Sequence, residues 1–311
     1  MGASMDAGAL LRRQGYRPTS SPSDSGRRFP DGAEFRIEIP SVEGPRVLEA
    51  AVNEADRYDL TLNRVSQGSG GMLLEEAELR EMAAIGASVG LEVSLFTGPR
   101  AGWDIGVFSR SNAGGGQFAQ LRGLRQLGYA VADILRATEA GIRSFLVGDL
   151  GLLSVVTRMQ DEGELPSETV WKISAYMGVS NPATIKTLEE MGAGTVNIPA
   201  DVTLEQLSEI RASVSLPVDL YLETPDGMGP VVRGHEIADF VAVGAPLYAK
   251  MGLANAAGVY PSGGHVVDVA IANAREKVRR AAIALEWLRR MRPASVQSKP
   301  HAEGLGVPVA P

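Results

Sequence analysis

The sequence contains no cysteine and only three histidines, His235, His265 and His301. The absence of cysteine excludes disulfides, a cysteine nucleophile, cysteine-ligated zinc and an iron–sulfur cluster held by cysteines. Three scattered histidines do not suit a multi-histidine metal site. Carboxylates are therefore the expected ligands of any metal that this chain binds.

Long apolar runs and dense basic blocks are also missing. No run approaches the ~18 apolar residues that span a bilayer, so no membrane partner is expected. The net charge of −7 and the lack of a Lys/Arg cluster argue against nucleic acid as a partner. The first residues lack the apolar core of a secretory signal, which favours a cytoplasmic protein. No G-x-G-x-x-G follows the first strand, so no nucleotide cofactor is expected.

Composition divides the chain into three parts. Residues 1–33 and 294–311 are rich in Ser, Pro and Gly, which predicts a flexible N-terminal tail and a flexible C-terminal tail. Residues 34–293 are predicted to form one domain.

Eight β-rich runs in this domain alternate with segments of helical pattern. The runs are 35–40, 59–66, 91–98, 144–151, 170–178, 195–201, 218–225 and 239–248. Eight such units in about 260 residues predict a (β/α)₈ TIM-like barrel, with a doubly wound open sheet as the alternative. The long amphipathic segment 265–291 would close the barrel, and its excess length leaves open a homo-oligomer.

The strand alternation places polar side chains inside the barrel, where Val, Ile and Leu are usual. Buried charges are costly unless they are paired or bind a ligand. We expect Arg36, Lys172 and Asp219, early in their strands, to form a structural network. Glu38 and Glu223 lie later in their strands and are the better candidates for chemistry.

Further polar residues follow the strand ends, at the face where barrel enzymes carry their sites. The predicted catalytic residues are Glu38, Asp149, Glu223 and Lys250. Glu38 and Glu223 would hold a divalent metal, Mg or Mn, or act as acid and base. Lys172 and Lys250 keep a Schiff-base mechanism open.

A second set of residues is predicted to bind substrate. It comprises Arg64, Gln67, Arg100, Tyr176, Asn197, Ser262 and Gly263. The last two open the final helix, where free N–H groups can bind an anion. The mixture of acids with Arg and Lys suits a small, oxygen-rich, anionic molecule.

Several stretches resemble one protein family. They are FRIEIPSVEGPRVLEAAV, RVSQGSGG, GPRAGWD, YMGVSNPATIKTLEEMGAGTVNIPADVTLEQLSEIR and PVDLYLETPDG. Over residues 35–292 they are similar to bacterial proteins labelled U32 peptidases, of which this chain would be a cysteine-free branch. The resemblance implies a TIM-like barrel whose seventh strand carries functional groups. Hydroxylases of the family use cysteines that this chain does not have.

Our first hypothesis is a barrel enzyme with lyase, isomerase or aldolase-type chemistry on a small anionic metabolite. The second is a peptidase or amide hydrolase that uses a carboxylate-bound metal. The third is a non-catalytic ligand-binding barrel.

Overall fold

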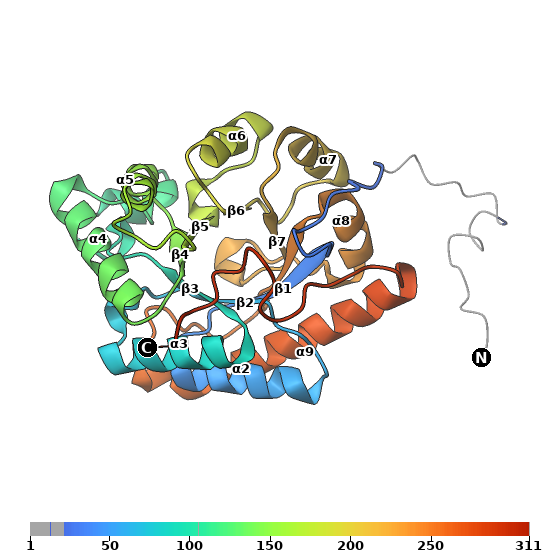
Figure 1. Cartoon of the computed structure of the whole chain (residues 1–311), viewed down its shortest axis with the longest axis horizontal. Coiled ribbons are helices and arrows are strands. Elements are labelled where there is room, and N and C mark those ends of the chain that lie inside the picture. The colour runs from blue at the N-terminus through green and yellow to red at the C-terminus, as the bar shows by residue number, and fades with distance from the viewer. Residues whose placement is uncertain (1–12, 14–21, 105, 311) are drawn as a thin grey trace.

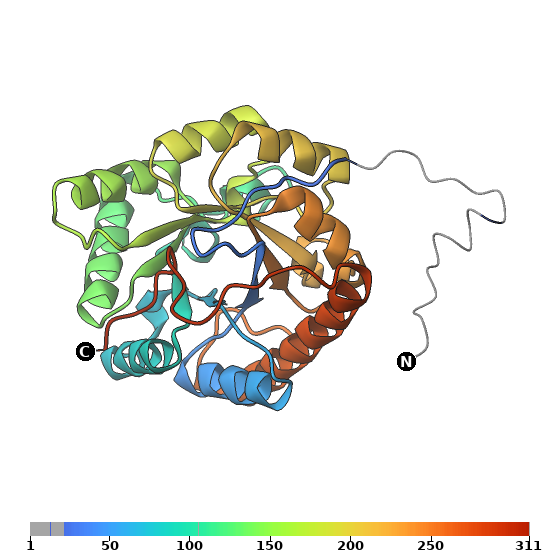
Figure 2. The ribbon, with the colours of Figure 1, turned by 45° about the vertical axis from the view of Figure 1, so that its right-hand side comes forward.

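The computed structural model describes residue 13, residues 22–104 and residues 106–310. In this part of the chain, eight parallel strands form a closed barrel with helices around it (Figures 1 and 2). The predicted (β/α)₈ barrel is therefore confirmed. The strands are β1 (Phe35–Pro40), β2 (Arg64–Gln67), β3 (Glu92–Phe96), β4 (Ser144–Val147), β5 (Val170–Ile173), β6 (Thr195–Asn197), β7 (Val218–Glu223) and β8 (Leu247–Met251).

The helices begin and end at recognisable signals. Asn181 accepts a hydrogen bond from the Thr184 amide before α6, Thr203 and Gln206 form a capping box at α7, and Gly90 ends α3 in the left-handed conformation. The helices are α2 (Pro45–Arg57), α3 (Glu76–Val89), α4 (Gly123–Glu139), α5 (Leu150–Asp161), α6 (Pro182–Glu190), α7 (Leu204–Ser213), α8 (Ile237–Gly244) and α9 (Val267–Met291).

The last strand differs from the prediction. The run 239–248 was expected to be a strand, but most of it belongs to α8, and β8 follows at Leu247–Met251. α8 is buried on nearly every side, so its sequence lacks the polar face that distinguishes a surface helix. A short apolar run of this kind is ambiguous between strand and helix. The shift places Lys250 inside β8 rather than after it.

The strand residues alternate between two environments. Ile37, Val65 and Leu220 pack with the helices in the main apolar core. Between them, Glu38 and Lys172 are fully buried inside the barrel. Glu38 stands in register with Arg64 of β2 and with Lys250 of β8. The barrel interior is therefore polar, as the alternation predicted. Its charged side chains come from neighbouring strands and lie next to one another.

Both terminal segments close the N-terminal end of the barrel, where Figure 2 shows them crossing beneath the strands. Residues 294–310, expected to be a flexible tail, contact the barrel floor. Ser298 accepts a hydrogen bond from Arg36 Nε at 2.9 Å, and its carbonyl accepts one from Asn63 at 2.9 Å. The Pro/Gly-rich composition gave no sign of these partners, because they are buried polar groups of distant strands.

At the other end of the chain, residues 22–33 also pack against this floor. Phe29 meets Tyr248 edge to face, with ring centroids 5.5 Å apart, and the Ser25 amide donates to Ala242 O at 2.8 Å. The rest of the expected N-terminal tail, residues 1–12 and 14–21, lies outside the described residues.

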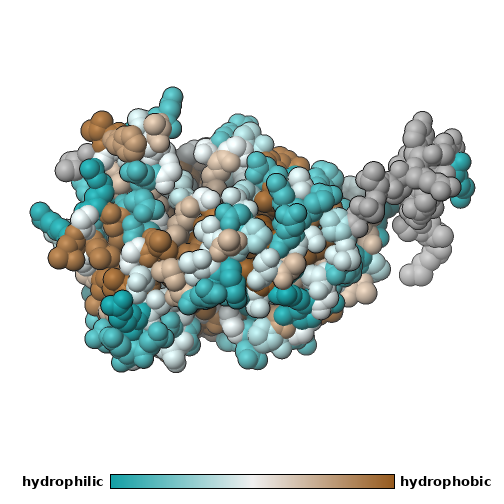
Figure 3. Space-filling view, turned by 90° about the horizontal axis from the view of Figure 1, so that it is seen from above, coloured by the Kyte–Doolittle hydropathy of each residue, from teal (hydrophilic) through white to brown (hydrophobic). Residues whose placement is uncertain are grey.

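The outer surface is mainly hydrophilic, with apolar side chains gathered toward one end of the face in Figure 3. This is the side on which Figure 1 labels α4 and α5. Val107 and Leu124 are the most exposed apolar residues, at 82% and 83%. Among the helices of residues 22–104 and 106–310, none combines the length and apolarity needed to span a bilayer. A homo-oligomer stays a prediction.

Candidate active site at the C-terminal mouth of the barrel

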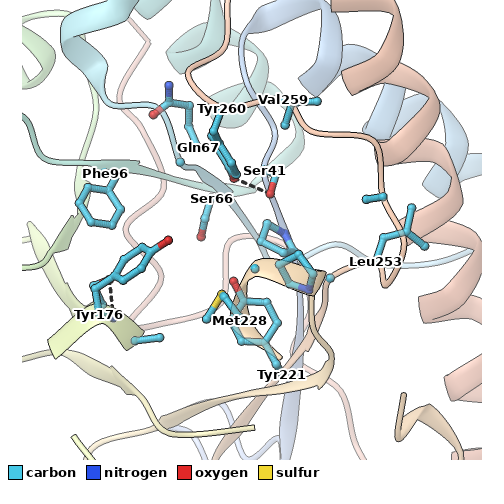
Figure 4. A pocket seen from close by; sticks show the side chains of 18 of the residues that line it. Ser41, Ser66, Gln67, Phe96, Tyr176, Tyr221, Met228, Leu253, Val259 and Tyr260 are labelled. Carbon is cyan, nitrogen blue, oxygen red and sulfur yellow. Dashed lines mark hydrogen bonds between the residues drawn. The ribbon is translucent and has the colours of Figure 1, made fainter. Parts of the chain in front are cut away.

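A cavity of about 290 Å³ opens at the C-terminal ends of the strands. Figure 4 shows Ser66 and Tyr221 on its strand side and Leu253, Val259 and Tyr260 on the loop between β8 and α9. Its polar lining includes Ser41, Ser66, Gln67, Arg100, Ser174, Tyr176, Asn197, Tyr221, Asp226, Lys250, Tyr260, Asn273 and Lys277. The position is the one at which (β/α)₈ enzymes carry their active sites.

Two buried lysines share one carboxylate at the cavity floor. Lys250 Nζ lies 3.0 Å from Glu38 Oε1 and donates to Asn197 Oδ1 at 3.0 Å. Lys172 Nζ binds the same Glu38 oxygen and donates to Ser66 Oγ at 3.1 Å. Lys250 and Ser66 line the cavity, whereas Glu38 and Lys172 lie beneath it. The floor is therefore a cationic surface supported from below by one acid.

The two lysines that share this carboxylate differ in pKa. Burial alone would raise the pKa of Glu38, but Lys172, Lys250 and Arg64 outweigh it and hold that pKa well below its usual range. Burial lowers the pKa of Lys172 to about 7 despite the attraction of Glu38. For Lys250, the attraction of Glu38, Tyr221 and Asp219 exceeds the effect of burial and raises the pKa. Near neutral pH, Lys250 is the fixed cation and Lys172 is the amine that exchanges a proton.

A second charged layer lies below the lysines. Arg64 contacts Glu92 at 2.7 Å and Asp219 at 3.0 Å, and its guanidinium stacks 3.6 Å above the centre of the Tyr248 ring. Lys172 also lies 3.5 Å from Asp219, so these two residues are paired as expected. Arg36 does not reach Asp219 and binds Ser298 and Tyr248 instead. This layer fixes the position of the lysines from underneath.

Arg100 forms one wall of the cavity. Its guanidinium lies 3.9 Å from the centre of the Phe96 ring and 4.2 Å from that of Trp103, and Nη1 donates to Gly68 O at 2.8 Å. Nε and Nη2 are buried and have no hydrogen-bond partner among the described residues. Burial lowers the pKa of Arg100 to about 10, so it is charged at neutral pH. Because these two donors lack an acceptor, an anion that reached the guanidinium by a small shift of its side chain would satisfy them.

The loop after β8 forms another part of the cavity wall and meets the Arg100 side at Gly68. Tyr260 Oη and Ser41 Oγ are hydrogen-bonded at 2.5 Å (Figure 4). A Cβ atom at position 68 would collide with the Tyr260 ring, so the close approach of this loop to β2 requires Gly68.

The structure brings five of the predicted site residues together in the cavity wall. They are Gln67, Arg100, Tyr176, Asn197 and Lys250, with Glu38 directly beneath. Their catalytic and binding roles stay predictions. Arg64 lies deeper, in the charged layer described above.

Four other predicted residues do not line the cavity. Asp149 caps α5 through the Leu152 amide at 2.9 Å. Glu223 accepts from the Ala254 amide at 3.0 Å. The Ser262 amide donates to Ser69 Oγ at 2.8 Å, and Gly263 precedes the short helical turn before α9.

The proposed pair of metal ligands, Glu38 and Glu223, stays a prediction. Glu38 Oε1 already accepts from Lys172 and from Ser66, the latter at 2.5 Å, and lies 3.0 Å from Lys250. A divalent cation at this carboxylate would face the positive charge of Lys172, Lys250 and Arg64. In the described ranges, no group of three or more His, Asp or Glu residues has the spacing of a metal site. The donor set suits lysine chemistry better than metal chemistry.

The cavity residues outside the predicted site include Lys277 and Tyr260. Lys277 lies on a helix, and a lysine in an amphipathic helix is normally solvated, so the sequence carried no signal for it. Tyr260 lies in a loop of irregular structure. Lys172 was considered as a nucleophile but was not included in the predicted site.

The model of peptidase family U32 matches residues 124–224. The predicted resemblance to this family is confirmed over these residues. No curated protein sequence matches the chain.

Solved structures with similar folds include several barrels. The U32 peptidase Mk0906 is 16% identical, with 66% of this chain and 71% of that one covered at a TM-score of 0.37. Thiamine phosphate pyrophosphorylase from Pyrococcus furiosus is 10% identical, with 82% and 97% covered at a TM-score of 0.44. An oxaloacetate acetylhydrolase is 11% identical, with 70% and 75% covered at a TM-score of 0.42.

Proposed function

We propose that this barrel is an enzyme of the lyase or aldolase type, acting on a small carbonyl compound that carries an anionic group. One observation carries the proposal. Lys250, a buried cation fixed by Glu38 and Asn197, faces the same cavity as Arg100, which has two free donors. A substrate with its carbonyl oxygen at Lys250 and its anionic group at Arg100 would supply a hydrogen-bond acceptor to each of these two side chains.

Lys250 would stabilise the charge that develops during the reaction. When the bond between the α and β carbons of the carbonyl compound breaks, its electron pair forms the double bond of an enolate, and the carbonyl oxygen takes up the negative charge. A preorganised cation in a buried site stabilises such an oxyanion strongly, with effects of about 10²–10³-fold for one donor. Lys250 needs no movement for this role, since Glu38 and Asn197 already fix its Nζ.

Lys172 and Ser66 would move the proton. In an aldol cleavage, the hydroxyl group next to the breaking bond loses its proton as the second carbonyl forms. Ser66 Oγ lines the cavity and lies 3.1 Å from Lys172 Nζ. Its hydroxyl donates to Glu38 in this structure, and by turning to the neutral amine it can relay the proton to Lys172. The same amine can return the proton to the enolate carbon. A pKa of about 7 suits both directions near neutral pH.

The test compares the parent protein with Lys250→Met in a screen of 4-hydroxy-2-oxo acids, with release of the aldehyde or 2-oxo acid product as the readout. Lys186→Met, at an exposed lysine of α6, is the matched control. We expect turnover in the parent and the control, and a fall in kcat of about 10²–10³-fold in Lys250→Met.

Other outcomes separate the alternatives. A Lys250→Met protein with full activity contradicts the proposal. Binding without turnover in the parent favours a non-catalytic ligand-binding barrel. Cleavage of peptides that is lost on chelation favours the amide hydrolase.

A further inference from the structure

Lys277 is a buried lysine of the cavity wall that the mechanism above does not use. It reaches the cavity from α9, and its side chain is 4% exposed. Nζ donates to Pro40 O at 2.8 Å. Within the described ranges no ion pair joins Lys277 to an acid, and Pro40 O is the one hydrogen-bond acceptor for its three N–H bonds. A buried ammonium group in this state is costly unless a ligand supplies the missing charge.

The cavity wall has an excess of positive charge. Its charged lining residues are Arg100, Lys250, Lys277 and one acid, Asp226. Asp226 is exposed and accepts a hydrogen bond from the Asn255 amide at 2.8 Å. Glu38 lies below the wall and is already shared by two lysines. The buried Glu43 acts on both Arg100 and Lys277, but burial raises its own pKa, so it offsets their positive charge only in part. One anionic group on Arg100 would therefore leave Lys277 without a full counter-charge.

The three cations enter from different sectors of the barrel. Arg100 follows β3, Lys250 belongs to β8, and Lys277 lies on α9, which packs against α2. In the closed strand order, β3 is separated from β8 by β1 and β2 on one side and by β4 to β7 on the other. Arg100 and Lys277 therefore enter the cavity from different elements, and one ligand that contacts both must extend between them.

We propose that Lys277 forms a second anion subsite and that the substrate is a dianion, a 2-oxo dicarboxylic acid with one carboxylate on Arg100 and the other on Lys277. This inference rests on the proposed function, because it places the carbonyl of the same substrate over Lys250. Burial lowers the pKa of Lys277 to about 8, while Glu43 acts to raise it and Lys250 to lower it. The ammonium form therefore predominates at neutral pH, where the subsite would act.

The test uses two probes of equal chain length, 2-oxoglutarate and 2-oxopentanoate, which differ in the terminal carboxylate. Their dissociation constants are measured by calorimetry near neutral pH for the parent, Lys277→Met, Arg100→Met and the control Lys186→Met. A charge-assisted hydrogen bond corresponds to about 10–100-fold in affinity. We expect the parent and the control to prefer 2-oxoglutarate by this factor. Lys277→Met should lose the preference and bind 2-oxopentanoate like the parent.

The outcomes distinguish the two proposals. A parent that binds both acids equally, or a Lys277→Met protein that keeps the preference, overturns the second subsite and leaves the proposed function standing. If Arg100→Met weakens the binding of both acids by the same factor, the result supports the proposed function. If neither acid binds to the parent, both proposals fall. Lys277→Gln, which keeps hydrogen-bond donors but removes the charge, provides a second variant if the methionine substitution prevents folding.

Discussion

Replacing Glu38 with glutamine tests the central charge arrangement of the barrel. Glu38 is fully buried and is the common partner of Lys172 and Lys250, with Arg64 at 3.4 Å. Glutamine keeps the shape of the side chain but removes its negative charge. The lysines then remain in the same low-dielectric interior without the group that compensates them.

The expected loss of stability is large. Removing one partner of a buried ion pair costs about 3–5 kcal/mol, because the remaining charge is left uncompensated. For a chain of 311 residues, an unfolding entropy of about 2 cal/mol/K per residue converts this loss into a fall in Tm of about 5–8 °C. Thermal unfolding followed by circular dichroism measures it directly.

The loss should also depend on pH. Without Glu38, the pKa of Lys172 in the folded state falls below its present value of about 7, and the pKa of Lys250 falls as well. Both lysines regain an ordinary pKa when the chain unfolds, so the unfolded state of the variant binds more protons than the folded state. Its stability therefore rises with pH more steeply than that of the parent. The difference in Tm should be larger at about pH 6 than at about pH 9.

A matched control removes an acid from the surface instead. Glu286 is an exposed residue of α9, and Glu286→Gln should change stability by less than about 0.5 kcal/mol. A Glu38→Gln protein with the Tm of the parent at both pH values would refute the charge network. A constant deficit at both pH values would show that the lysines do not carry the uncompensated charge.

Two further predictions concern the proton relay and the barrel floor. The kcat of the parent should rise with pH through about 7, since Lys172 must be neutral to accept a proton; Lys172→Met should lack this rise, and an unchanged pH profile in the variant would contradict the relay. Arg36→Met removes the donors to Ser298 Oγ and Tyr248 Oη and should lower the free energy of unfolding by about 1–3 kcal/mol. Denaturant unfolding measures this loss, and a variant as stable as the parent would show that the C-terminal segment does not depend on this contact.

Much of the fold could be predicted because its signals are local. The first strand has the bounds expected from its alternation, and the caps at Asn181 and Thr203 are residue types that commonly begin helices. The polar interior followed from the same alternation, since the apolar residues of each strand had to face the helices. The exception was the run 239–248, where a fully buried helix has no polar face and reads like a strand.

The site was less predictable, because position at a strand end does not fix the partner of a side chain. Asp149 and Glu223 are such acids, and the structure shows them bound to backbone amides of neighbouring loops. Arg100 and Lys250 have the same kind of sequence context, yet they line the cavity. To predict that Lys277 lines the cavity, one must know how α9 packs against the barrel, and the sequence pattern does not give this packing.

The closed floor of the barrel has a consequence for proton exchange. Arg36 and Ser298 are almost inaccessible to water, and the terminal segments cover them from below. Water therefore does not reach the lysine pair past these floor residues, whereas Lys250 borders the cavity at the mouth. A ligand that fills the mouth would separate Lys172 and Lys250 from bulk water. The protons bound to the two lysines when the ligand enters would then stay in the complex. The pH of the medium would thus act on the free protein, and the bound state would preserve the protonation with which it formed.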